Sequence, residues 1–311
     1  MTRLREVEAL AAGRAAPVAR YLAPVRWGAA VVETSRPRQW PKNLLVFAAP
    51  LAGASLGRDD GPGYALVAAA AFVVASAAVY FVNDVTDAER DRRHPVKRHR
   101  AVAAGRLPES HALAIASLCT VTALAAGFAI AEPGLSAMIA VYLAFSMLYT
   151  LILKHIPVVE LVLVASGFVL RAAGGAIATH VPPSGWFLVV CSLGALMVAI
   201  AKRYTELAML DDAAARHRPV MRWYSAKVLR LGQRAVACAM TGAYVLWALG
   251  EQNPWMRGWH LASAIALAVA IIRFDRLTAR TSGKPVEDLI ARDGVMVYCE
   301  LAWLTMFAAG L

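Results

Sequence analysis

The amino-acid sequence predicts an all-α membrane protein with about nine transmembrane helices. Of its 311 residues, 59% are hydrophobic and only 17% are charged, whereas soluble globular proteins carry about 25% charged residues. The mean hydropathy is +0.54. Long apolar segments recur along the chain, and basic residues gather in every second connection between them. This composition excludes a disordered chain, a collagen-like repeat, a secreted disulfide scaffold and an ordinary soluble domain.

Each predicted transmembrane helix corresponds to roughly 20 mainly apolar residues, the length that crosses a bilayer. In chain order the candidates are 43–57, 64–82, 111–131, 134–153, 157–179, 184–203, 229–249, 259–275 and 293–311. The first candidate is short and contains Pro50, so eight helices is an alternative count, as is ten. The second, from Tyr64 to Val82, is the most uniformly apolar.

The distribution of basic residues predicts the orientation in the membrane. The chain has 32 Lys and Arg against 21 Asp and Glu, a net charge of +11. The N-terminal segment and alternate connections carry nearly all of these cations, and the intervening connections hold only Arg58 and Arg257. Because basic loops stay on the cytoplasmic side, we expect a cytoplasmic N-terminus and a multi-pass protein of the plasma (inner) membrane. Residues 1–35 are expected to be a cytoplasmic tail, partly amphipathic or disordered, and residues 36–311 a single transmembrane domain.

An acidic cluster directly follows the second predicted helix. It contains Asn83, Asp84, Asp87 and Asp91. If the helix continues, the three aspartates occupy positions i, i+3 and i+7 and lie on one face. Mg²⁺ binds one or two carboxylates and completes its shell with water and phosphate oxygens, so such a face suits this ion. The alternative is a solvated loop in which these acids pair with the arginines beside them, Arg90, Arg92 and Arg93.

Basic residues continue the same segment, among them Lys97 and Arg100. Metal-binding acids on one side and cations on the other are typical of a site for a polyphosphate. His94 and His99 are predicted to be loop residues, because Mg²⁺ prefers oxygen ligands to imidazole nitrogen.

These residues resemble a known family. The pattern Asn83-Asp-x-x-Asp87-x-x-x-Asp91, followed by His94-Pro95-x-Lys97, is similar to the first aspartate-rich motif of the UbiA superfamily of intramembrane prenyltransferases. Further similar segments are 36–43, 153–155, 166–172 and 202–206. Within the superfamily the likeness, which covers roughly residues 35–300, is greatest to actinobacterial phosphoribosyltransferases that use decaprenyl phosphate. The resemblance implies a bundle of helices around a central polar cavity open to the cytoplasm, with residues 36–311 as the catalytic domain, and a homotrimer.

One departure from the ordinary prenyltransferases is informative. The place of their second aspartate-rich motif reads AKRYTEL over residues 201–207, which is basic with one acid. Asp211 and Asp212 follow, but adjacent residues on a helix face different directions. One acid cluster with extra cations suits phosphoribosyl pyrophosphate, which carries a Mg²⁺-bound diphosphate and a 5-phosphate. The resemblance therefore implies Mg²⁺-dependent transfer of 5-phosphoribosyl to decaprenyl (polyprenyl) phosphate, a precursor of the arabinose donor for cell-wall arabinan.

The resemblance and the chemistry together assign site residues. Asp84, Asp87 and Asp91 are expected to be catalytic and to hold the metal together with Asn83. Substrate contacts are expected from the polar residues Lys42, Asn43, Asn83, Lys97, Arg100, Lys154, Arg171, Lys202, Arg203, Tyr204 and Glu206. Arg171 is expected to face the polar cavity, because an intramembrane guanidinium is costly unless it is paired or hydrated. Its alternative partner, Glu160, lies about three helical turns away.

Other functions remain open from the sequence. One alternative is an ordinary prenyltransferase of the same fold, which would attach an isoprenoid to an aromatic acceptor. Another is a transporter of a phosphorylated or lipid solute, although transporters place their charges near the middle of the membrane. Nucleic acid is not expected as a partner of so apolar a chain. The segment 281–288 is expected to be a turn, either a plain loop or a lid.

Overall fold

The computed structural model describes residues 27–53, 60–210, 219–280 and 286–311. Within these ranges the chain forms α-helices, 3₁₀-helices and connecting turns, and no β-strand. The predictions for residues 1–26 and 54–57, for Asp211 and Asp212, and for residues 281–285 of the possible lid lie outside the described residues. The all-helical prediction is confirmed for the described part of the chain.

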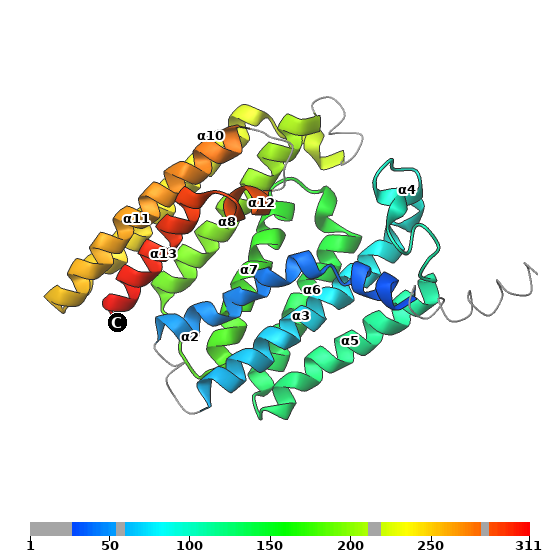
Figure 1. The fold of residues 1–311 in the computed structure, drawn as a ribbon, viewed down its shortest axis with the longest axis horizontal. Coiled ribbons are helices and arrows are strands. Elements are labelled where there is room, and N and C mark those ends of the chain that lie inside the picture. Colours follow the sequence, from blue (N-terminus) through cyan, green and yellow to red (C-terminus); the bar gives the residue numbers. More distant parts are fainter. Residues whose placement is uncertain (1–26, 54–59, 211–218, 281–285) are drawn as a thin grey trace, which may run out of the picture. The chain divides into compact units, whose positions relative to one another are not determined.

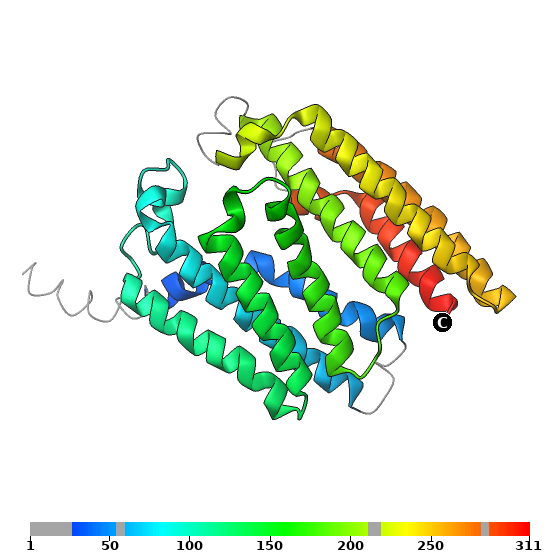
Figure 2. The ribbon, with the colours of Figure 1, turned by 180° about the vertical axis from the view of Figure 1, so that it is seen from behind.

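The described residues form a series of helices along the chain (Figures 1 and 2). They are η1 (Pro37–Phe47), α2 (Ala48–Ala52), α3 (Gly61–Thr86), α4 (Ala88–Arg92), η3 (Lys97–His99), α5 (Glu109–Ala129), α6 (Pro133–Leu151), η4 (Leu153–His155), α7 (Val159–Ala178), α8 (Gly185–Leu210), η6 (Pro219–Trp223), α10 (Ala226–Leu249), α11 (Pro254–Ala279), α12 (Val286–Ala291) and α13 (Gly294–Ala309). Residues 27–34 are helical as well.

Five of the described helices are long and apolar enough to cross a membrane. They are Gly61–Thr86, Glu109–Ala129, Pro133–Leu151, Val159–Ala178 and Gly185–Ala208. Three more predicted spans coincide with α10, α11 and α13. The chain is therefore an integral membrane protein, and the count of nine spans stays a prediction.

The first predicted span, 43–57, differs from the expectation. Its described residues form the end of the 3₁₀-helix η1 and the five-residue helix α2. Pro41 lies inside η1 and Pro50 inside α2. Proline lacks a backbone N–H and its ring clashes with the preceding turn, so two prolines this close oppose one continuous α-helix.

The described chain divides into two compact units, and α3 contributes to both. The first unit comprises Met1–Pro41 and Val73–Ala123. Its core is built from small residues around two larger ones, Phe81 and Leu107, which are almost fully buried. Ala77 of α3 and Ala112 of α5 belong to the same core. Small side chains allow helix backbones to approach closely, which is how membrane helices gain van der Waals contact.

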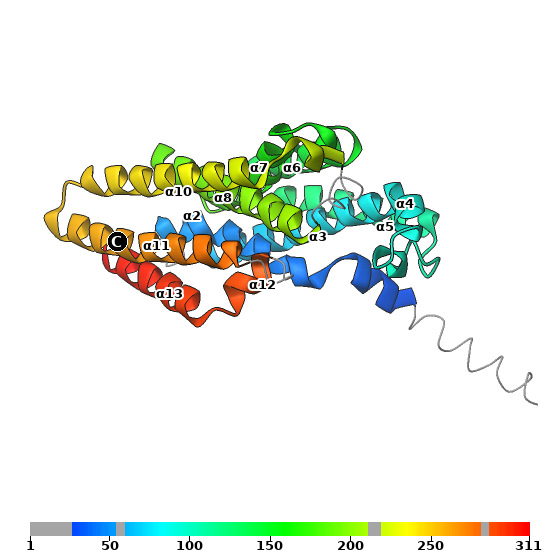
Figure 3. The same cartoon turned by 90° about the horizontal axis from the view of Figure 1, so that it is seen from above.

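The second unit comprises Lys42–Phe72 and Leu124–Leu311. Its long helices pack in chain order: α6 on α7, α7 on α8, α8 on α10, α10 on α11 and α11 on α13. Figure 3 shows α10 and α11 as an antiparallel pair joined by a short connection. The start of α10 and the end of α11 therefore lie at the same end of this pair.

Gly175 of α7 marks a very close approach to the backbone at Val46. A Cβ atom added to Gly175 would lie 1.8 Å from the carbonyl oxygen of Val46, whereas one added to Gly242 of α10 would meet nothing within 4 Å. We expect Gly175→Ala to lower the free energy of unfolding by about 3 kcal/mol, because the backbone must move apart. Gly242→Ala is the control, and its higher helix propensity predicts no loss. Thermal denaturation in detergent measures both, and equal behaviour of the two variants would contradict this packing.

Candidate functional site

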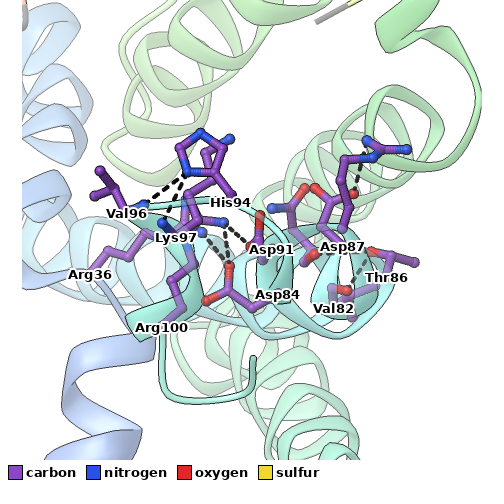
Figure 4. A network of polar contacts seen from close by, with 12 residues as sticks. Arg36, Val82, Asp84, Thr86, Asp87, Asp91, His94, Val96, Lys97 and Arg100 are labelled. Atoms are coloured by element: carbon purple, nitrogen blue, oxygen red, sulfur yellow. Dashed lines mark hydrogen bonds and ion pairs between the residues drawn. The ribbon is translucent and has the colours of Figure 1, made fainter. Parts of the chain in front are cut away.

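The acidic cluster of the first unit is organised around two buried carboxylates. The side chains of Asp84 and Asp91 are each only 4% exposed. Both contact Nη1 of Arg100, at 3.3 Å from Oδ1 of Asp84 and 2.7 Å from Oδ2 of Asp91 (Figure 4). The two carboxylates thus converge on a single cationic nitrogen, which is the arrangement that a bound cation requires.

Helical geometry explains why residues seven apart meet. Although α3 ends at Thr86 and α4 begins at Ala88, the backbone hydrogen bonds continue through the break. The N–H of Asp87 donates to the carbonyl of Asn83 at 3.0 Å, and the N–H of Asp91 donates to the carbonyl of Asp87 at 2.8 Å. Positions i and i+7 therefore stay on one face, as the spacing predicts.

Asp87 has an ion pair with a neighbouring arginine. Its Oδ1 lies 3.6 Å from Nη1 of Arg90, the partner suggested by the alternative of a solvated loop. Arg92 and Arg93 instead pair with Glu109 and Glu89. No group of three acidic, histidine or cysteine side chains in the described ranges is arranged to hold a metal. The structure therefore brings Asp84 and Asp91 to one arginine, with Asn83 half-buried on the preceding turn. A metal role for Asp87 stays a prediction.

Arg36 is a second cation of this cluster, and sequence reasoning did not assign it to the site. Its guanidinium forms an ion pair with Asp84 (Figure 4). It also lies 4.7 Å from the centre of the Tyr80 ring. The backbone of Arg36 has a φ of +52°, a conformation that is uncommon for a non-glycine residue and recurs at functional sites. Arg36 is the first residue of segment 36–43, which is similar to the UbiA superfamily, and this position could have indicated a role in the site.

Four residues, Arg36, Asp84, Asp91 and Arg100, form what we call the ion quartet. Its two positive and two negative side chains make it neutral. Lys97 lies beside it in η3, half-buried. Nδ1 of His94 accepts the backbone N–H of Lys97 at 3.2 Å, which agrees with the prediction that His94 is a loop residue.

The second unit holds Arg171 in a buried hydrogen-bond network. The residue is 6% exposed. Its Nε donates to Oδ1 of Asn43 at 2.7 Å, and its Nη2 donates to the hydroxyl of Tyr142 at 2.9 Å. Protein groups therefore satisfy much of its hydrogen-bonding capacity, and the polar cavity beside Arg171 stays a prediction. Two predicted site residues, Asn43 and Arg171, do meet.

Arg203 is engaged in a buried ion pair. Its Nε and Nη2 donate to the two carboxylate oxygens of Glu160 at 2.6 and 2.7 Å. Glu160 is fully buried, and the Arg203 side chain is 9% exposed. Nη1 of Arg203 also donates to Glu206 at 3.0 Å. The ion-pair partner of Glu160 is thus Arg203, and not Arg171 as the alternative suggested. Two predicted site residues, Arg203 and Glu206, also form an ion pair with each other.

Tyr224 joins this ion pair to the turn before α7. Its hydroxyl accepts the backbone N–H of Val158 at 2.9 Å and donates to Oε1 of Glu160 at 3.4 Å. Val158 has a φ of +65°, which is strained for a β-branched residue. Burial raises the pKa of the Tyr224 phenol, so it stays protonated as a donor. The same turn begins with η4, which carries the half-buried Lys154.

The remaining predicted residues of this unit are half-buried, namely Lys42, Lys202 and Tyr204. Nζ of Lys202 lies 5.9 Å from the centre of the Phe168 ring. Phe168 borders an apolar cavity of about 280 Å³, which is also lined by Leu45, Cys191 and Val198. A cation therefore lies next to an apolar cavity, a combination that suits a lipid with a charged head group.

Comparison with known proteins decides the family. Residues 44–286 match the UbiA prenyltransferase family. The chain belongs to this family. The decaprenyl-phosphate phosphoribosyltransferase of Mycobacterium tuberculosis H37Rv is 39% identical over 293 residues, which cover 93% of this chain and 96% of the relative. The enzyme of the same name from Mycolicibacterium smegmatis is 35% identical over 294 residues. The matched residues cover 90% of this chain and 92% of the relative.

The UbiA fold is supported independently by a solved structure. The UbiA homologue from Archaeoglobus fulgidus, solved with GPP and Mg²⁺, has a TM-score of 0.68 to this chain. The match covers 90% of this chain and 98% of the archaeal one, at 13% sequence identity. At this identity the similarity establishes the fold alone. The family resemblance seen in the aspartate motif is confirmed.

Proposed function

We propose that this UbiA-family protein transfers the 5-phosphoribosyl group from phosphoribosyl pyrophosphate to decaprenyl phosphate. The observation that carries the proposal is its identity of 35–39% with decaprenyl-phosphate phosphoribosyltransferases over most of both chains. The products are pyrophosphate and decaprenylphosphoryl-5-phosphoribose. A role in supplying arabinose for cell-wall arabinan goes with this activity.

The ion quartet and its neighbours are the proposed site of the donor diphosphate and of Mg²⁺. The donor set fits this ion, because carboxylate oxygens are its preferred ligands and it needs only one or two of them. Asp84 and Asp91, which already share one cationic contact, would hold it, with Asp87 and Asn83 on the adjoining turn. Bound Mg²⁺ supplies Lewis-acid stabilisation of the departing diphosphate. Arg36, Lys97 and Arg100 would bind the phosphate oxygens that the metal leaves free.

The proposed reaction requires no general base from the protein. The bond from ribose C1 to the diphosphate oxygen breaks, and a bond from C1 to an oxygen of the lipid phosphate forms. The bonding electron pair leaves with pyrophosphate, and C1 develops oxocarbenium character. The lipid phosphate is already an anion, so no general base has to remove a proton. This agrees with a site made of acids and cations.

The second unit offers features that suit the lipid acceptor. The apolar cavity beside Phe168 would take the first isoprene units, and Lys202 would bind the phosphate of the lipid. The internal pairing of Arg203 with Glu160 and Glu206 gives both residues a positioning role for the end of α8, in place of direct substrate contact. A second metal site of the prenyltransferase type is not proposed, because segment 201–207 has one acid and that acid is paired.

The arrangement in the membrane completes the proposal. The excess of Lys and Arg in alternate connections supports a cytoplasmic N-terminus and a cytoplasmic opening of the site. Both soluble and lipid substrates would then be used at the inner face of the plasma membrane. Nine spans, one catalytic domain over residues 36–311 and a homotrimer remain part of the proposal.

The test is a product assay on the purified protein in detergent. It receives Mg²⁺, labelled phosphoribosyl pyrophosphate and decaprenyl phosphate, and the lipid fraction is examined by mass spectrometry. We expect a phosphoribosylated lipid that needs Mg²⁺ and is absent after chelation. Parallel reactions contain a prenyl diphosphate and an aromatic acceptor.

Two other outcomes of this assay would indicate a different function. Prenylation of the aromatic acceptor, without phosphoribosylated lipid, would identify an ordinary prenyltransferase. Movement of unchanged solute into proteoliposomes, with no covalent product, would identify a transporter. Either result would overturn the proposal.

A further inference from the structure

A separate charged cluster lies between the start of α10 and the end of α11. Oδ2 of Asp275 accepts hydrogen bonds from Nη2 of Arg230 at 3.1 Å and from Arg234 at 3.3 Å. The next residue, Arg276, is exposed and has no ion pair with any described residue. Among the described side chains, this cluster therefore has three guanidinium groups and one carboxylate, an excess of positive charge.

The hydrogen bonding of this cluster is incomplete. Gln233 is 1% exposed, and its Nε2 donates to Oγ1 of Thr278 at 3.2 Å and to Oδ1 of Asp275 at 3.4 Å. Within the described part of the chain, its Oε1 is buried with no hydrogen-bond partner, and so is Nη1 of Arg230. Because buried polar groups are almost always hydrogen-bonded, the unpaired oxygen of Gln233 indicates a ligand that donates a hydrogen bond to it.

A cavity of about 260 Å³ adjoins the cluster. Gln233, Arg234, Asp275 and Arg276 form its polar part, and Ile271 and Ile272 belong to its apolar part. The sequence predicts that α10 and α11 cross the membrane, and these residues lie where the antiparallel pair ends. With both predicted spans placed across the membrane, these residues fall at the level of lipid head groups, where basic pockets between transmembrane helices bind anionic lipids.

We infer that this cavity binds the head group of an anionic phospholipid, as a site additional to those of the two substrates. Arg234 and Arg276 bind the phosphate, as guanidinium groups do in charge-assisted pairs. Oε1 of Gln233 accepts a hydrogen bond from a head-group hydroxyl. The apolar residues Ile271 and Ile272 contact the first carbons of an acyl chain. The inference does not depend on the proposed activity.

The test uses the full-length protein in detergent and native mass spectrometry. Phosphatidylglycerol, phosphatidylmethanol and phosphatidylcholine with the same acyl chains are titrated in parallel. We expect phosphatidylglycerol to bind about tenfold more tightly than phosphatidylcholine, a difference that the Arg234→Gln, Arg276→Gln double variant removes. Arg257→Gln, at the other end of α11, is the matched control and keeps the preference.

Two further arms separate this site from general electrostatic attraction. Phosphatidylmethanol has the charge but no free hydroxyl, so the wild type should favour phosphatidylglycerol over it and Gln233→Leu should lose that discrimination. Equal binding of all three lipids by the wild type would overturn the inference. So would displacement of the lipid by millimolar inorganic phosphate, or self-association of the chain through this face without lipid selectivity.

Discussion

Asp84→Asn and Asp91→Asn are each expected to lower the rate of phosphoribosyl transfer at least about 100-fold. An amide is a neutral and weaker ligand for Mg²⁺ than a carboxylate, and each substitution also leaves the two arginines of the ion quartet with only one carboxylate. The product assay described above measures the loss. It should be accompanied by a melting temperature, because both side chains are buried in the first unit.

The control for these two variants comes from the same segment. Glu89 pairs with Arg93 at 2.8 Å, but its side chain is 75% exposed and lies outside the ion quartet. Glu89→Gln removes one negative charge from the segment without touching Asp84 or Asp91, so activity should stay near the wild-type value. Equal losses of activity in Asp84→Asn, Asp91→Asn and Glu89→Gln would mean that activity depends only on the net charge of this segment.

The largest effect on stability is expected from Arg203→Met. This variant leaves the carboxylate of Glu160 fully buried without its bidentate partner. Breaking a buried ion pair from one side typically costs about 3–5 kcal/mol of unfolding free energy. Thermal denaturation in detergent should show a correspondingly large fall in melting temperature.

Two further variants separate the ion pair from ordinary packing. The double variant Glu160→Leu, Arg203→Met removes both charges, and apolar replacements of similar volume commonly restore stability, so most of the loss should be recovered. Glu206→Gln alters the partly exposed partner of the same guanidinium and should cost no more than about 1 kcal/mol. A double variant as unstable as Arg203→Met would show that the loss does not come from an unpaired buried charge.

Local patterns in the sequence predicted much of the fold. Helices α3, α5, α6, α7 and α8 follow from long, mainly apolar runs, since a run of about 20 such residues identifies a membrane helix. The first candidate span did not form one helix because Pro41 and Pro50 oppose it. The meeting of Asp84 with Asp91 followed from their spacing, because the hydrogen bonding of the helix continues through Asp87.

Long-range partners could not be predicted in this way. Arg203 is 43 residues from Glu160, and Arg171 is 128 residues from Asn43. Which helices bring these side chains together is decided by packing, and no local period encodes it. Arg36 was likewise missed as a partner of Asp84, although its segment carried part of the family resemblance.

The neutrality of the ion quartet has a consequence for metal binding. A divalent cation that enters alone must displace Arg100 from both carboxylates, which leaves an excess of positive charge. A cation that enters with the donor diphosphate brings its own negative charge, and Arg100 can then bind phosphate. We therefore expect the metal to bind tightly only together with the donor.

The most direct measurement is electron paramagnetic resonance of Mn²⁺, used in place of Mg²⁺, with and without phosphoribosyl pyrophosphate. The wild type should hold Mn²⁺ weakly alone and tightly with the donor, and Arg100→Gln should hold Mn²⁺ alone more tightly than the wild type. The Asp84→Asn, Asp91→Asn double variant should bind it in neither condition. If that double variant holds Mn²⁺ with the donor as the wild type does, the metal site lies elsewhere and the central claim is wrong.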